Sequence, residues 1–164
     1  MTMELRPGLS GWWLRAAIAV VGVAVLGVLE LQGLGFSLLI VFGVILVVAV
    51  AMPASPGMTV LIGGAAVATG FMDGSTLSVE AVLLIPLLHL GHVLAGIAGV
   101  LPVGSRLHLS AFRRPLRRYL LIQVSVLALV AVVLVLPAGR IDPIVEVAGL
   151  LAAAGIALVA LPRR

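Results

Sequence analysis

The sequence predicts an all-α polytopic membrane protein, a compact bundle of about six transmembrane helices that forms a single domain over residues 1–164. Two observations predict this class. The chain is 63% hydrophobic and only 10% charged, with a mean hydropathy of +1.35, whereas soluble domains carry about a quarter charged residues. Its charged residues also lie mostly at the edges of apolar runs that are long enough to cross a bilayer core of about 30 Å. A soluble domain is therefore excluded.

Six runs with few or no charges make up most of the chain. They cover residues 12–31, 36–52, 58–72, 77–101, 119–136 and 144–161. The first ends in LELQG without a small-residue cleavage site, so it is an uncleaved span rather than a signal peptide. The second ends at PASPG, whose prolines cannot continue a helix. Pro86 lies inside the fourth run, and membrane helices tolerate such prolines. The runs therefore predict six spans.

The third run, residues 58–72, is short for a span. At 1.5 Å per residue it is about 22 Å long, which is less than the thickness of the hydrocarbon core. An alternative architecture therefore has five spans, with residues 58–72 forming a re-entrant hairpin.

Arginine positions predict the orientation, because short cytoplasmic loops collect arginine. Residues 103–118 are predicted as a cytoplasmic loop with no acidic residue and with Arg106, Arg113, Arg114, Arg117 and Arg118. Arg6, Arg15, Arg163 and Arg164 belong on the same side. We therefore expect a multi-pass protein of the cell membrane with both termini cytoplasmic. This arrangement needs an even number of crossings, which favours six spans over five.

Residue usage excludes several kinds of chemistry. The chain has no cysteine, so thiolate metal sites, thiol redox chemistry and disulfides are excluded. Its positive charge is explained by the placement of the arginines without a nucleic-acid partner. No P-loop, nucleophile elbow or His-Glu-x-x-His motif occurs. The sequence therefore predicts no cofactor and no nucleic-acid binding, and it leans against an enzyme.

His89 and His92 lie three residues apart in the stretch PLLHLGHVLAG of the fourth run. At about 100° per residue they differ by roughly 60°, so they share one helix face. Gly91, Ala95 and Gly99 form a ridge of small residues beside them, and such ridges pack against other helices. We therefore expect both histidines to face protein near the middle of the membrane.

Three interpretations of the histidine pair stay open. In the first, neutral imidazoles hydrogen-bond across helices and fix their packing, with Ser37, Gln123 or Ser125 as partners. In the second, the pair handles protons or cations, since ionisable groups at this depth often mark pathways. In the third, the pair binds a metal or haem, but a metal needs further donors and two ligands on one face cannot bind opposite sides of one iron. We favour the packing interpretation.

Glu30, Glu80 and Glu146 are predicted near the outer ends of three different helices. Together they could form an acidic vestibule that attracts cations or a basic partner. We favour the simpler interpretation that they are solvated residues at helix ends. Glu80 and Glu146 fall in first helical turns, where the helix dipole stabilises a negative charge.

The stretch SAFRRPLRRYL, residues 110–120, places Arg113, Arg114, Arg117 and Arg118 at helical spacing. It is typical of an interfacial segment whose guanidinium groups contact anionic lipid headgroups. A cytoplasmic partner with an acidic face would use the same arginines, and topogenic charge alone also accounts for the pattern.

These features favour a small integral membrane protein that acts as a non-catalytic accessory or structural subunit of a membrane protein complex. The expected partners are the lipid bilayer, anionic lipid headgroups, and other membrane proteins or a second copy of the chain, because glycine-rich helix faces are available for packing. The alternative is a proton- or cation-coupled transporter or channel that uses His89 and His92. A membrane-embedded metal-dependent enzyme is the third hypothesis.

Overall fold

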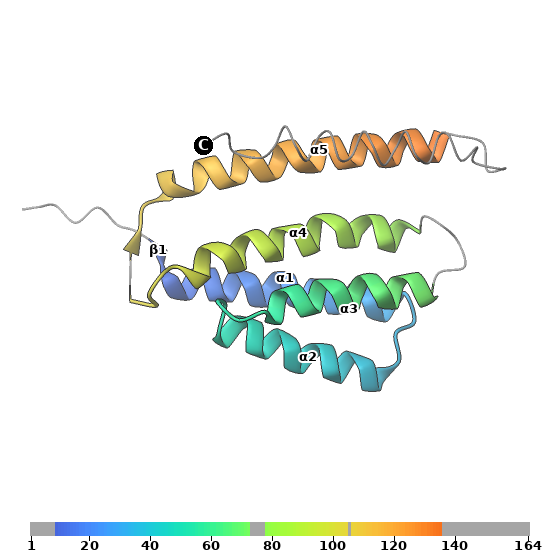
Figure 1. Cartoon of the computed structure of the whole chain (residues 1–164), viewed down its shortest axis with the longest axis horizontal. Helices are drawn as coiled ribbons and strands as arrows, with labels where there is room; N and C mark the ends of the chain where they lie inside the picture. The colour runs from blue at the N-terminus through green and yellow to red at the C-terminus, as the bar shows by residue number, and fades with distance from the viewer. Residues whose placement is uncertain (1–8, 73–77, 105, 136–164) are drawn as a thin grey trace, which may run out of the picture. The chain divides into compact units, whose positions relative to one another are not determined.

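The computed structural model describes residues 9–72, 78–104 and 106–135, and within them the fold is helical (Figure 1). The α-helices are α1 (Gly11–Leu31), α2 (Phe36–Ala51), α3 (Gly57–Met72), α4 (Val79–Gly99) and α5 (Arg113–Val135). A 3₁₀ helix, η1 (Leu109–Phe112), precedes α5. The two-residue strands β1 (Leu9–Ser10) and β2 (Arg106–Leu107) pair with each other in antiparallel fashion. The sixth predicted span, residues 144–161, and Glu146 lie outside the described residues.

Three described segments are long and apolar enough to cross a membrane, namely Gly11–Leu31, Val79–Gly99 and Ser110–Val132. α2 and α3 are apolar but shorter, about 24 Å each at 1.5 Å per residue. These helices are compatible with the predicted membrane association. The chain divides into two compact units, Met1–Val130 and Ala131–Arg164, and the contacts discussed below all lie within the first.

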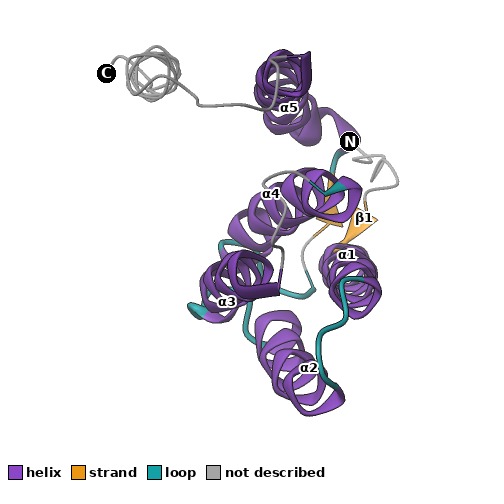
Figure 2. Cartoon of the chain, turned by 90° about the vertical axis from the view of Figure 1, so that its right-hand side faces the viewer, coloured by secondary structure: helices purple, strands orange, loops and turns teal. Residues whose placement is uncertain are grey.

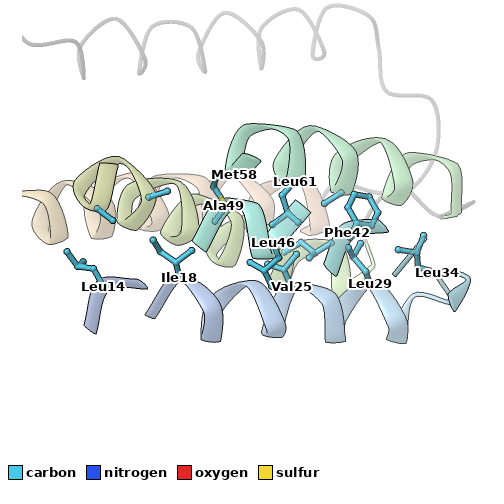
Figure 3. Packing of buried hydrophobic residues seen from close by; sticks show 14 residues of the cluster. Leu14, Ile18, Val25, Leu29, Leu34, Phe42, Leu46, Ala49, Met58 and Leu61 are labelled. Atoms are coloured by element: carbon cyan, nitrogen blue, oxygen red, sulfur yellow. The ribbon is translucent and has the colours of Figure 1, made fainter. Parts of the chain in front are cut away.

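α1, α2, α3 and α4 contact one another in a ring, in that order and back to α1 (Figure 2). Each helix contributes buried side chains to a common apolar core (Figure 3). The buried residues of α1 recur every three or four positions, which is the spacing of a single helix face. They are Gly11, Leu14, Ile18, Gly22, Val25 and Leu29.

The turn after α1 depends on a glycine in the left-handed region. Gly33 has a φ of 90°, and its N–H donates to the carbonyl of Glu30 over 2.8 Å. The N–H of Leu34 donates to the carbonyl of Leu29 over 3.0 Å. This pair of bonds is a Schellman motif, in which the residue after the glycine also packs against the last helical turn. Leu29 and Leu34 are both buried, so this contact is present here.

Small residues allow close contact inside the ring. A Cβ added at Gly91 would lie 3.2 Å from the side chain of Met58, and one added at Gly99 would lie 3.3 Å from the Cα of Ala54. Ala95, between them on the same ridge, is buried. The predicted ridge of α4 therefore does pack against neighbouring parts of the chain.

The N-terminal end of α1 lies beside the segment that follows α4. The short strands pair Ser10 with Arg106, so the start of the described chain and the arginine-containing segment share one end of the ring. Trp12 and Trp13 are exposed in the first turn of α1 at this same end. Such a pair is typical of the aromatic belt at membrane interfaces.

Arg15 caps the C-terminal end of α2. Its Nη1 donates to the carbonyl oxygen of Ala51 over 2.6 Å and to that of Val50 over 3.2 Å. Carbonyls in the last turn of a helix have no helical N–H partner, and the negative end of the helix dipole favours a cation there. Arg15 therefore stabilises a helix end as well as carrying charge.

α3 runs without interruption from this end of the ring to the other. A Cβ added at Gly57, its first residue, would lie 3.1 Å from the backbone nitrogen of Ala49, near the carbonyls that Arg15 binds. Near its last turn, the Thr69 hydroxyl donates over 3.1 Å to Oε1 of Gln32, the residue that caps α1. Residues 58–72 thus lie in one continuous helix and do not form a hairpin.

α5 begins at Arg113, six residues before the run that started at Tyr119 in the sequence prediction. Residues 113–118 of the predicted loop are therefore helical, which corrects the loop assignment and agrees with the helical spacing of their four arginines. Arginine and leucine are good helix formers. Pro115 is accommodated because it lies in the first turn, where its missing N–H removes no helical hydrogen bond.

Candidate functional site

The polar contact nearest the middle of α4 joins it to α5. The Gln123 amide donates from Nε2 to Nδ1 of His89 over 2.8 Å. Gln123 is only 6% exposed, and His89 is half-buried. Because the amide nitrogen can only donate, this bond requires Nδ1 of His89 to be unprotonated.

Tyr119 adds two further contacts between the same helices. Its ring lies 5.1 Å from the His89 ring at an interplanar angle of 47°. Its hydroxyl donates to the carbonyl oxygen of Pro86 over 3.1 Å. Tyr119 and Gln123 are four residues apart on α5, so both reach α4 from one helix face. His89, Tyr119, Gln123 and the Pro86 carbonyl form what we call the α4–α5 polar cluster.

Gln123 was one of three hydrogen-bond partners expected for the histidines from the sequence. The other two do not contact them. Ser37 is exposed near the start of α2, and the Ser125 hydroxyl donates to the carbonyl of Leu121 in its own helix over 3.0 Å.

His92 is exposed, so the expectation that both histidines face a neighbouring helix is wrong for this residue. At about 100° per residue, the ridge of Gly91, Ala95 and Gly99 is centred roughly 90° around α4 from the histidine pair. The ridge packs into the ring, and the histidines lie on the side of α4 that faces away from the ring. α5 contacts this outward side through His89.

The two predicted site acids that the structure describes, Glu30 and Glu80, do not join the polar cluster. Glu30 is exposed in the last turn of α1. Glu80 lies in the first turn of α4, as predicted, next to Ser78, whose hydroxyl accepts from the Ala81 N–H over 3.1 Å. Glu80 precedes His89 by about 13 Å along the helix at 1.5 Å per residue.

Among the described residues, no group of three or more histidine, aspartate or glutamate side chains lies close enough to hold a metal ion. The hydrogen bond of His89 is with an amide and its ring contact is with a phenol, and neither group is a carboxylate. In this part of the chain the arrangement supplies a link between helices rather than a set of metal ligands.

The arginines at the start of α5 divide between two faces of the helix. Arg114 and Arg118 line a cavity of about 320 Å³. The cavity is also lined by His89, Val93, Pro115, Tyr119 and Ile122. Arg113 and Arg117 do not line it, and their face is about 100° away around the helix. Arg106 belongs to β2 and not to α5.

A second cavity of about 370 Å³ adjoins the first, since both are lined by Val93 and Pro115. Its other described lining residues carry no charged side chain. They are Gly96, Ile97, Val100, Leu101, Ala111 and Phe112. We call the two cavities together the α4–α5 groove.

Two members of the polar cluster were not identified as site residues from the sequence, Tyr119 and the Pro86 carbonyl. The four-residue spacing of Tyr119 and Gln123 was a signal that could have indicated Tyr119. No sequence pattern would have identified a backbone carbonyl as the acceptor. The chain matches no protein family model, no curated protein and no solved structure.

Proposed function

We propose that this chain is a multi-pass protein of the cell membrane and acts as a non-catalytic accessory or structural subunit, packing against another membrane protein or a second copy of itself. The observation that carries the proposal is the outward face of α3. Small residues follow one another along this face and are all exposed: Thr59, Gly63, Ala66 and Gly70.

These four residues fall within about 60° of one another around α3, at 100° per residue. A Cβ added at Gly63 or Gly70 would meet no described atom within 4 Å. On the other side of the same helix, Gly64 and Ala65 face the ring, and a Cβ at Gly64 would come within 2.5 Å of the Phe42 ring. α3 thus has an inner set of small residues that is packed and an outer set that is not.

An unpacked glycine in a helix has a cost, since it is about 1 kcal/mol less favourable than alanine there. In a lipid environment, small residues allow the backbones of two helices to approach, and this packing drives association. The outward face of α3 is therefore best explained by a helix of a partner that packs on it.

The proposed topology has six crossings and cytoplasmic termini. It is supported by the common location of Ser10 and Arg106 at one end of the ring, because arginine-rich segments favour the cytoplasmic side. It is also supported by the uninterrupted course of α3 from that end to the end marked by Gln32.

The test uses single cysteines in a chain that has none of its own. Ala66→Cys places a thiol in the small-residue face, and Val60→Cys places one on the neighbouring exposed face of α3. In native membranes, Ala66→Cys is expected to give a specific crosslinked product under oxidising conditions or with a short bifunctional reagent. The mass of the product distinguishes a second copy from another protein, and Val60→Cys should give far less.

A bulky substitution provides the second arm. Gly63→Leu is expected to abolish copurification of the partner from mild detergent, whereas Gly43→Leu should retain it, because Gly43 on α2 also has space for a side chain. If the partner is retained equally by both variants and Ala66→Cys forms no product, the proposal is wrong.

A further inference from the structure

We infer that the α4–α5 groove binds one anionic phospholipid, with the phosphate held by Arg114 and Arg118 and an acyl chain against the apolar walls. This inference is independent of the packing face on α3, which lies on another helix.

The charge of the groove fits an anion. Arg114 and Arg118 are one helical turn apart on the same face of α5 and line one cavity together. Among the described residues, none of those that line the two cavities is acidic. Guanidinium groups present several N–H donors in a plane and bind phosphate oxygens in pairs.

The shape of the groove fits an amphiphile rather than a free anion. The described side chains that line the adjoining cavity of about 370 Å³ are all apolar. Inorganic phosphate would leave this cavity unfilled, whereas an acyl chain would remove its apolar surface from water. A protein with an acidic surface would more readily reach Arg113 and Arg117, which do not line the groove.

The expected level of the groove in the membrane also fits a lipid. Arg114 lies in the first turn of α5, and the segment before α5 pairs with β1, directly before Trp12 and Trp13. Exposed tryptophans gather at the level of lipid headgroups. The groove then extends about 12 Å along α5 from Arg114 to Ile122, at 1.5 Å per residue.

The first experiment compares two pairs of arginines. The purified chain in an uncharged detergent is titrated with phosphatidylglycerol or phosphatidylcholine, and bound lipid is counted by native mass spectrometry. The wild type is expected to bind one phosphatidylglycerol in preference to phosphatidylcholine. The double variant R114Q/R118Q should bind it at least roughly tenfold more weakly, since each arginine near an anionic lipid contributes measurably.

The matched control is R113Q/R117Q, which removes the same charge from the same two turns of α5. It should lower the affinity for phosphatidylglycerol by less than about threefold, because this variant loses only long-range electrostatic attraction and no direct contact with the phosphate. An equal loss of phosphatidylglycerol affinity in the two double variants would show that the lipid responds to the overall positive charge of α5 and not to a specific site. This result would overturn the inference.

The second experiment fills the apolar part of the groove. A Cβ added at Gly96 would meet no described atom within 4 Å, so Gly96→Leu extends into the cavity without a clash at its first atom. It should abolish the preference for phosphatidylglycerol while both arginines remain. Gly43→Leu on α2 is the control and should bind like the wild type, and the thermal melt of each variant verifies that it is folded.

Two results would contradict the location of the acyl chain. The first is an unchanged lipid affinity in Gly96→Leu. The second is displacement of phosphatidylglycerol by excess inorganic phosphate, which would indicate a simple anion site. Retention of the lipid in phosphate, together with its loss in Gly96→Leu, supports the inference.

Discussion

Gln123 on α5 donates a hydrogen bond to Nδ1 of His89 on α4 across 2.8 Å. Among the described residues it is also the one polar side chain that is buried. Hardly any other residue in the apolar part of α5 is buried. The polar cluster is therefore a main attachment of α5 to α4, and this attachment also shapes the α4–α5 groove.

A double-mutant cycle with His89→Ala and Gln123→Ala should reveal direct coupling between these residues. Interhelical hydrogen bonds in membrane proteins contribute about 0.6 kcal/mol on average and at most about 1.7 kcal/mol, so we expect a coupling energy in this range. Reversible unfolding in mixed micelles would measure it. Ser125→Ala should show no coupling with His89→Ala, because Ser125 bonds within α5. Additive effects of His89→Ala and Gln123→Ala would contradict a direct bond.

Arg15→Gln should destabilise the ring. The variant weakens the two charge-assisted bonds to the carbonyls of Val50 and Ala51, and hydrogen bonds to charged groups contribute about 1.5–3 kcal/mol when well formed. Because Arg15 is half-exposed, we expect a loss of about 1 kcal/mol of unfolding free energy. Arg15→Lys should lose less. Arg113→Gln, which removes an exposed arginine at the same end of the ring, is the control, and an equal loss there would show that general charge is responsible.

The ends of α1, α2, α3 and α4 could be predicted from the sequence to within two residues, because glycine and proline mark each turn. Gly33 and the PASPG segment leave the chain few other conformations. The start of α5 could not be predicted in the same way. Its first two turns carry four arginines, and a run of charge resembles a loop when hydropathy alone is considered, although arginine favours helix.

The candidate site was predicted only in part, because periodicity gives the angle between two residues of a helix but not the direction in which they face. The small residues Gly91 and Ala95 correctly indicated a packed side of α4. Assigning His92 to that same side was wrong, since a separation of roughly 60° from the centre of the ridge is enough to turn it outward. The sequence also could not predict that Arg114 and Arg118, and not Arg113 and Arg117, line the groove. This depends on the position of α4 relative to α5.

Two glycines of α1 should respond in opposite ways to substitution by alanine. At Gly22 an added Cβ would collide with the Leu46 side chain, whereas at Gly27 it would meet no described atom within 4 Å. Gly22→Ala should therefore cost about 1–3 kcal/mol of unfolding free energy through overpacking. Gly27→Ala should leave stability unchanged or raise it by up to about 1 kcal/mol through helix propensity. Chemical or thermal unfolding of both variants measures the difference, and similar results for the two would contradict the packing of α1 on α2.

Single cysteines should report the sides of the membrane to which the helix ends belong. Ala54 and Gly104 are exposed at the end of the ring that carries Arg15, and Gly35 and Val79 are exposed at the other end. In intact cells a membrane-impermeant maleimide should label Gly35→Cys and Val79→Cys, but it should label Ala54→Cys and Gly104→Cys only after permeabilisation, because arginine-rich ends stay inside. The decisive pair is Ala54 and Val79, which flank α3. Labelling of both from the same side would mean that α3 does not cross the membrane, and the six-span topology would then be wrong.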